Sequence, residues 1–225
     1  MANDRWERLA PLSGIVFVAL IIAGFAVFGT PPKADEPIDK ITTFFTVHRS
    51  RMLLGWSMVG LAVVFFFWFL GSLRSALARA EGGTGRLSSV AFASGVAKAG
   101  LFLAVGAVLG TLVYRVAGEG NAAVIRALFD LQIFLGLVSQ VPLAVLMIAA
   151  SVVMIRTSSA PRWLGWAGLL LGLFQLVAMA AFAESGAMAP GGAIPKVAFI
   201  LFGLWVLAVS ILMLLRQGQV AKPTS

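Results

Sequence analysis

The sequence contains no cysteine and only one histidine, and this shortage excludes several kinds of chemistry. Without thiols the chain cannot form disulfides, bind iron–sulfur clusters or use a cysteine nucleophile. With His48 as the only imidazole, one chain cannot supply a bis-histidine haem site or a multi-histidine zinc or di-iron site. We therefore expect no bound metal and no redox cofactor.

Charged residues are also scarce: they make up 12% of the 225 residues, whereas 60% are hydrophobic, and the mean hydropathy is +0.98. These values lie far outside the range of soluble globular domains. The net charge of +8 would suggest nucleic-acid binding in a soluble protein. Here the basic residues flank apolar stretches, where they meet anionic lipid headgroups. We expect membrane lipids as partners and no nucleic acid.

Six long apolar stretches indicate the fold. Because an α-helix needs about twenty apolar residues to cross the hydrocarbon core of a bilayer, each stretch is long enough to span a membrane. We expect an all-α, polytopic transmembrane helical bundle that forms a single domain over residues 1–225. The six predicted spans cover approximately residues 12–29, 52–73, 88–114, 122–154, 163–183 and 193–215. The first has the basic start of a signal peptide, but it is long and no clear A-x-A cleavage site follows, so we expect it to be retained.

The loops between these stretches indicate an orientation. The short loop between the fourth and fifth spans is flanked by Arg156 and Arg162 and contains no acidic residue, and short basic loops usually remain in the cytoplasm. We therefore expect both termini to be cytoplasmic. In the first outer loop, Pro37 can begin a helix, and apolar residues follow it at helical spacing, which predicts a short interfacial helix.

Charged side chains at the outer ends of two spans form a candidate ligand-binding site. Arg49 and Arg51 beside His48 combine guanidinium groups suited to phosphate or carboxylate with a histidine that titrates near neutral pH. Arg126 and Asp130 share one face of the fourth span and can close an outward-facing polar pocket with them. In the alternative interpretation the arginines anchor the helix to headgroups and Arg126 pairs with Asp130. Two further charges can join the rim: Glu184 and Lys196.

Three polar residues are predicted to lie deeper in the membrane. Lys98 is about ten residues into the third span, and its long stem can carry the ammonium group toward the cytoplasm. Gln140 and Gln175 can bridge helices by hydrogen bonds or line a transport pathway. Pro142 removes an amide donor two residues after Gln140, so we expect a kink in the fourth span.

Familiar reaction motifs are absent from the sequence. There is no P-loop, no dinucleotide fingerprint and no paired glutamates with a downstream histidine for a membrane metalloprotease. A serine protease would need a histidine on another span, whereas His48 lies in or beside an outer loop. We therefore assign no catalytic residue.

Several sequence patches, spread over nearly the whole chain, resemble one group of proteins. These patches are RWERLAPLSG at 5–14, FFTVHRSR at 44–51, FLGSLR at 69–74, AEGG at 80–83 and PRWLGW at 161–166. The chain resembles a broad set of small six-helix actinobacterial integral membrane proteins of unassigned function. The resemblance implies a multi-pass location in a bacterial plasma membrane, and it transfers no catalytic residue.

These observations favour the binding or transport of a small molecule or lipid through the outward-facing pocket. A structural or accessory subunit is the alternative, supported by glycine-rich helix faces that can contact another membrane protein or a second copy of the chain. An integral-membrane enzyme that modifies lipid is a third hypothesis, and it depends on His48 beside two arginines. Because no reaction motif is present, we expect a role other than catalysis.

Overall fold

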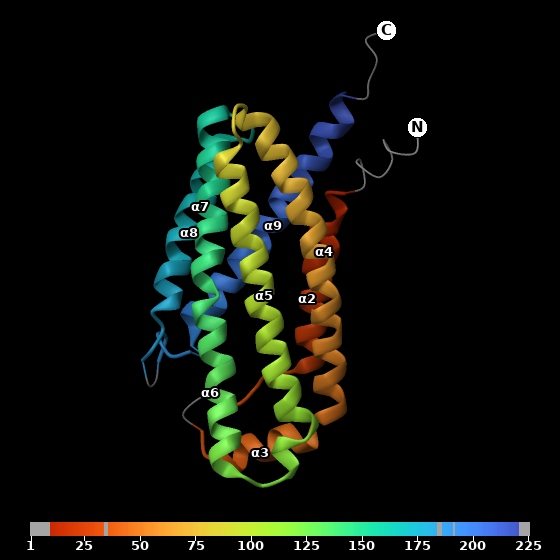
Figure 1. The fold of residues 1–225 in the computed structure, drawn as a ribbon, viewed down its shortest axis with the longest axis vertical. Coiled ribbons are helices and arrows are strands. Elements are labelled where there is room, and N and C mark those ends of the chain that lie inside the picture. The colour runs from red at the N-terminus through yellow and green to blue at the C-terminus, as the bar shows by residue number, and fades with distance from the viewer. Residues whose placement is uncertain (1–9, 34–35, 184–185, 191, 221–225) are drawn as a thin grey trace.

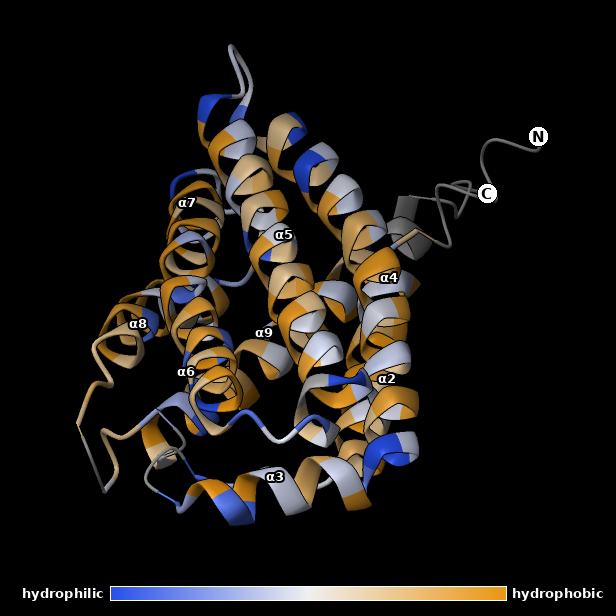
Figure 2. Ribbon diagram, turned by 60° about the horizontal axis from the view of Figure 1, so that its bottom comes forward, coloured by the Kyte–Doolittle hydropathy of each residue, from blue (hydrophilic) through white to orange (hydrophobic). Residues whose placement is uncertain are grey.

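The computed structural model describes residues 10–33, 36–183, 186–190 and 192–220, and every regular element in these ranges is helical (Figure 1). Most of the helices run side by side along the length of the molecule, and α3 lies across one end (Figures 1 and 2). The elements are α2 Leu12–Phe28, α3 Ile38–Val47, α4 Arg49–Glu81, α5 Arg86–Tyr114, the 3₁₀ helix η1 Val116–Gly118, α6 Ala122–Val138, α7 Gln140–Thr157, α8 Arg162–Met179 and α9 Ala193–Val220.

The two ends of this bundle differ in their connections. The α3 end carries α3, and the α4–α5 end carries the loop between α4 and α5 (Figure 1). Hydrophobic residues cover the helices between the ends, whereas hydrophilic residues gather at the ends (Figure 2). This distribution is the one expected for helices that cross a hydrocarbon layer.

Five helical segments in the described ranges are long and apolar enough to cross a membrane, and they indicate a multi-pass membrane protein. They are α4, α5, α8, the 193–216 part of α9, and the segment 122–157 that contains both α6 and α7. α2 is also apolar, but it has 17 residues, which at about 1.5 Å per residue is slightly shorter than the hydrocarbon core. Each of the six predicted stretches therefore contains a helix.

The fourth predicted stretch is divided into two helices. α6 ends at Val138 and α7 begins at Gln140, with Ser139 between them. Pro142 has no amide hydrogen to donate to the Val138 carbonyl, so the regular helical hydrogen bonding is interrupted at this point. The predicted kink is confirmed.

Glycines allow two pairs of helices to approach closely. A Cβ added to Gly55 of α4 would lie 2.7 Å from the Gly24 carbonyl oxygen of α2, so backbone meets backbone there. A Cβ on Gly172 of α8 would lie 2.7 Å from Ile148 of α7. These glycines serve packing within the chain, as small residues commonly do between membrane helices.

The helix α3 begins directly after Pro37, where the sequence predicts a helix. Its Ile41 and Phe45 are fully buried, and the Phe45 ring lies 5.9 Å from the ring of Phe129 in α6. Apolar contacts therefore attach α3 to the end of the bundle, while its other face carries exposed polar residues such as Lys40.

Candidate functional site

The structure places His48, Arg49 and Arg51 at the α3 end, at the junction of α3 and α4, but their side chains reach separate partners. His48 Nδ1 lies 3.1 Å from the carbonyl oxygen of Phe44, one turn earlier. The Arg49 guanidinium lies 4.9 Å from the centre of the Tyr114 ring. Arg51 Nε donates to the backbone carbonyl of Val27. Arg51 therefore connects the beginning of α4 to the end of α2.

The remaining two residues of the predicted pocket lie one turn apart on α6. Arg126 Nη2 donates to the Glu36 carbonyl oxygen at 2.9 Å, which links α6 to the segment before α3. Asp130 is half-buried, and the ion pairs among the described residues do not include an Arg126–Asp130 pair. Of the two expected rim charges, Lys196 is exposed in the first turn of α9, and Glu184 lies outside the described residues.

A shallow hollow of about 410 Å³ is present at this end of the molecule. It is lined by Asp39, Lys40, Thr43, Phe44, Val47 and His48. Only His48 among the five predicted residues lines it, so the structure does not gather the five side chains around this hollow.

Lys98 does not extend to the membrane surface. It is 7% exposed, and its Nζ donates to Ser139 Oγ at 2.6 Å, at the break between α6 and α7. Ser139 in turn donates to the Gly136 carbonyl oxygen, also at 2.6 Å. The expectation that Lys98 snorkels toward the cytoplasm is therefore wrong, because the break in the fourth span offers a buried hydroxyl acceptor.

The two glutamines differ in their contacts. Gln175 of α8 is fully buried, and its Nε2 donates to the Ala198 carbonyl oxygen of α9 at 2.9 Å. This bond confirms the predicted bridge between helices for Gln175. Gln140 is also buried, but its Oε1 has no hydrogen-bond partner among the described residues.

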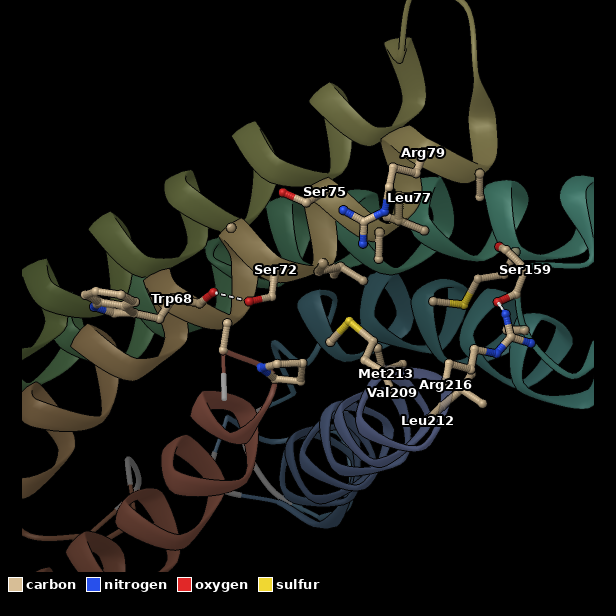
Figure 3. Close-up of a pocket in the computed structure, with 18 of the residues that line it drawn as sticks. Trp68, Ser72, Ser75, Leu77, Arg79, Ser159, Val209, Leu212, Met213 and Arg216 are labelled. Atoms are coloured by element: carbon tan, nitrogen blue, oxygen red, sulfur yellow. Dashed lines mark hydrogen bonds between the residues drawn. The ribbon is translucent and has the colours of Figure 1, made fainter. Parts of the chain in front are cut away.

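A large cleft that the sequence did not reveal opens at the α4–α5 end (Figure 3). We call it the α4–α9 cleft, and its volume is about 1060 Å³. α4 forms one wall and α9 the other, the turn before α2 adds Pro11, and the α7–α8 connection adds Ser159. Its main side chains are Phe67, Trp68, Leu73, Leu77, Arg79, Met154, Val209, Leu212, Met213 and Arg216.

The helices beside the cleft differ in length. α4 has 33 residues and α9 has 28, whereas α2, which packs against both, has only 17 and begins at Leu12. α4 and α9 extend past the beginning of α2 (Figure 1), and the cleft lies between these parts of the two helices. The individual lining residues resemble ordinary lipid-facing side chains, so the sequence carries no signal for the cleft.

The walls of the cleft are mainly apolar, and arginines lie toward one end. Figure 3 shows Arg79 on the α4 side and Arg216 on the α9 side. Arg216 Nη1 donates to the Ser159 carbonyl oxygen, which holds the end of α9 against the α7–α8 connection. Arg79 is exposed, and the two ion pairs among the described residues, Lys40–Glu36 and Arg115–Glu119, do not involve it.

Acidic side chains are scarce among the described residues of this end. The arginines in its helix ends are Arg74, Arg79, Arg86, Arg156, Arg162 and Arg216. The acid among its described residues is Glu81, which accepts the amide hydrogens of Leu87 and Ser88 at 2.8 and 2.9 Å. These bonds lower the pKa of Glu81, which lies beyond the apolar part of α4, and they hold its carboxylate at the first turn of α5.

No protein family, curated protein or solved structure matches this chain. The class of the protein therefore follows from its own structure: long apolar helices packed side by side define a multi-pass helical membrane protein. Within this class, the α4–α9 cleft is the candidate site, because its volume of about 1060 Å³ exceeds the 410 Å³ of the hollow at the α3 end.

Proposed function

We propose that the protein binds a membrane lipid with an anionic headgroup in the α4–α9 cleft. The observation that carries this proposal is one open cleft of about 1060 Å³ that combines apolar walls with the exposed guanidinium of Arg79. Binding pockets for small molecules are usually about 300–1,000 Å³ and mostly apolar, with a few placed polar groups. The cleft has this composition and is large enough for part of an acyl chain.

The position of the side chains supports entry from the surrounding bilayer. Trp68 is 60% exposed, and it lies at the wall of the cleft on the outer face of α4. An acyl chain would lie along Leu77 and Met213, which line the interior. The phosphate would meet Arg79, whose planar guanidinium binds two phosphate oxygens at once.

We further propose six spans with both termini in the cytoplasm of a bacterial cell and the protein in the plasma membrane. The α7–α8 connection supports this orientation because it is short and is flanked by Arg156 and Arg162. Under this orientation the α4–α9 cleft faces the cytoplasmic leaflet. Anionic headgroups at that surface attract the arginines of the α4–α5 end.

Replacement of Arg79 tests the headgroup contact. Arg79→Gln removes the exposed Arg79 guanidinium from the cleft, whereas Arg86→Gln removes an exposed arginine from the same end that does not line the cleft. We expect Arg79→Gln to weaken binding of phosphatidylglycerol about tenfold, because charge-assisted hydrogen bonds are lost. Native mass spectrometry of the purified protein with added lipid measures this change.

The controls separate specific binding from general attraction. Arg86→Gln should bind phosphatidylglycerol as the wild type does, and a diacylglycerol, which has no phosphate, should bind wild type and Arg79→Gln alike. Inorganic phosphate should not displace the lipid, since the apolar walls contribute to binding. Equal loss in the two arginine variants would show that only overall charge matters and would contradict the proposal.

A further inference from the structure

Two arginines line the α4–α9 cleft, one on each wall, and a single phosphate at Arg79 uses only one of them. Arg79 belongs to α4 and Arg216 to α9, and Figure 3 shows them on the two sides of the cleft. The described residues that line the cleft include no aspartate and no glutamate. The cleft therefore carries two positive charges that its own lining does not neutralise.

Arg216 is held in position and can still bind an anion. Its Nη1 donates to the Ser159 carbonyl oxygen in the α7–α8 connection. A carbonyl group is neutral, so this bond leaves the positive charge of Arg216 without an opposite charge. A guanidinium has five N–H donors, and the exposed Arg216 side chain therefore keeps donors beyond the one that Ser159 accepts.

The other arginines of this end do not line the cleft. The Arg74 guanidinium, although it also belongs to α4, lies 5.5 Å from the centre of the Phe92 ring of α5. Three more are not part of the cleft lining: Arg86, Arg156 and Arg162. The pair formed by Arg79 and Arg216 is thus specific to the cleft and does not extend over the whole basic end.

A lipid with one phosphodiester matches only half of this pair. Phosphatidylglycerol carries one negative charge, and when its phosphate meets Arg79 it leaves Arg216 without an anionic partner. A lipid with two phosphodiesters joined by a short linker can place one on each wall. Such a headgroup gives the better charge complementarity, and basic pockets between membrane helices bind headgroups of this kind.

The size of the cleft suits a large lipid. Its volume of about 1060 Å³ lies at the upper end of the range of about 300–1,000 Å³ found for small-molecule pockets. From Trp68 to Arg79 the α4 wall extends roughly 16 Å, at about 1.5 Å per residue. Trp68 is 60% exposed at the other end of this wall, so acyl chains can continue from the cleft into the bilayer.

We propose that the lipid in the α4–α9 cleft carries two phosphate groups, as cardiolipin does, and that Arg79 and Arg216 bind one phosphate each. This inference depends on the lipid binding proposed for the cleft. Within it, Arg216 is the residue that distinguishes a lipid with two phosphates from a lipid with one. The bound headgroup connects α4 to α9 across the cleft.

Two lipids and two cleft variants test this assignment by native mass spectrometry of the purified protein. Arg216→Gln should weaken cardiolipin binding about tenfold and leave phosphatidylglycerol binding unchanged, because only cardiolipin has a second phosphate. Arg79→Gln should weaken the binding of both lipids. Arg162→Gln removes an exposed arginine of the same end that does not line the cleft, and it should bind both lipids as the wild type does.

The outcomes separate this inference from lipid binding itself. Unchanged cardiolipin binding in Arg216→Gln would overturn the second phosphate contact, while weaker phosphatidylglycerol binding in Arg79→Gln would still support the lipid cleft. Equal weakening of both lipids by Arg216→Gln would give Arg216 only a structural role through Ser159 and would also overturn the inference. Displacement of cardiolipin by inorganic pyrophosphate would indicate a soluble diphosphate ligand and would overturn it as well. If Arg79→Gln weakened neither lipid, the proposed lipid binding would fail too.

Discussion

At the residue scale, the main difference from expectation concerns Lys98. The long side chain of lysine favours snorkelling, and nothing in the third span itself suggests otherwise. The acceptor comes from Ser139, 41 residues later in the chain. Because this contact depends on how α5 packs against the break between α6 and α7, the sequence around Lys98 could not predict it.

The bond between Lys98 and Ser139 predicts a coupled effect on stability. Ser139→Ala should lower the free energy of unfolding by about 2 kcal/mol, since the buried amino group loses its acceptor. In a Lys98→Met background the same change should cost clearly less, because no amino group remains to be satisfied. Unfolding titrations in detergent measure how much Ser139→Ala lowers the free energy of unfolding in each background. An equal decrease in the two backgrounds would contradict the bond.

At the element scale, apolar length predicts most helix positions. The predicted stretches 12–29 and 88–114 differ by no more than two residues at either end from α2 and α5. The break at Ser139 could also be predicted, because Pro142 removes a specific amide donor. The polar extension of α4 to Glu81 carries this helix beyond its apolar stretch, and the hydrogen bonds of Glu81 join it to α5.

The close approach of α2 and α4 predicts unequal effects of two glycine substitutions. A Cβ on Gly55 would lie 2.7 Å from backbone oxygen and 2.8 Å from the Phe28 nitrogen, whereas one on Gly60, on the same helix, meets nothing within 4 Å. Gly55→Ala should therefore lower stability by about 2 kcal/mol. Gly60→Ala should change it by less than about 1 kcal/mol. Thermal unfolding of the two purified variants measures their stability. A similar loss of stability in both variants would contradict this packing.

At the scale of the whole molecule, the sequence predicts a helical membrane bundle but not its cleft. Residues such as Trp68 and Met213 look like lipid-facing side chains in the sequence, and they lie 145 positions apart. They lie on opposite walls of the cleft, where α4 and α9 both extend past the beginning of the shorter α2. The sequence predicts a pocket of charged residues at the α3 end, but two of them, Arg51 and Arg126, donate to backbone carbonyls.

The most direct test of lipid binding is to fill the α4–α9 cleft without disturbing the fold. Gly71 lines the cleft and Gly60 does not, and a Cβ at either position meets no atom within 4 Å. Native mass spectrometry with phosphatidylglycerol should show a bound lipid on the wild type and on Gly60→Leu. Gly71→Leu should lose the lipid, because its new side chain occupies the cleft. Retention of the lipid by Gly71→Leu at the wild-type level would contradict binding in the cleft.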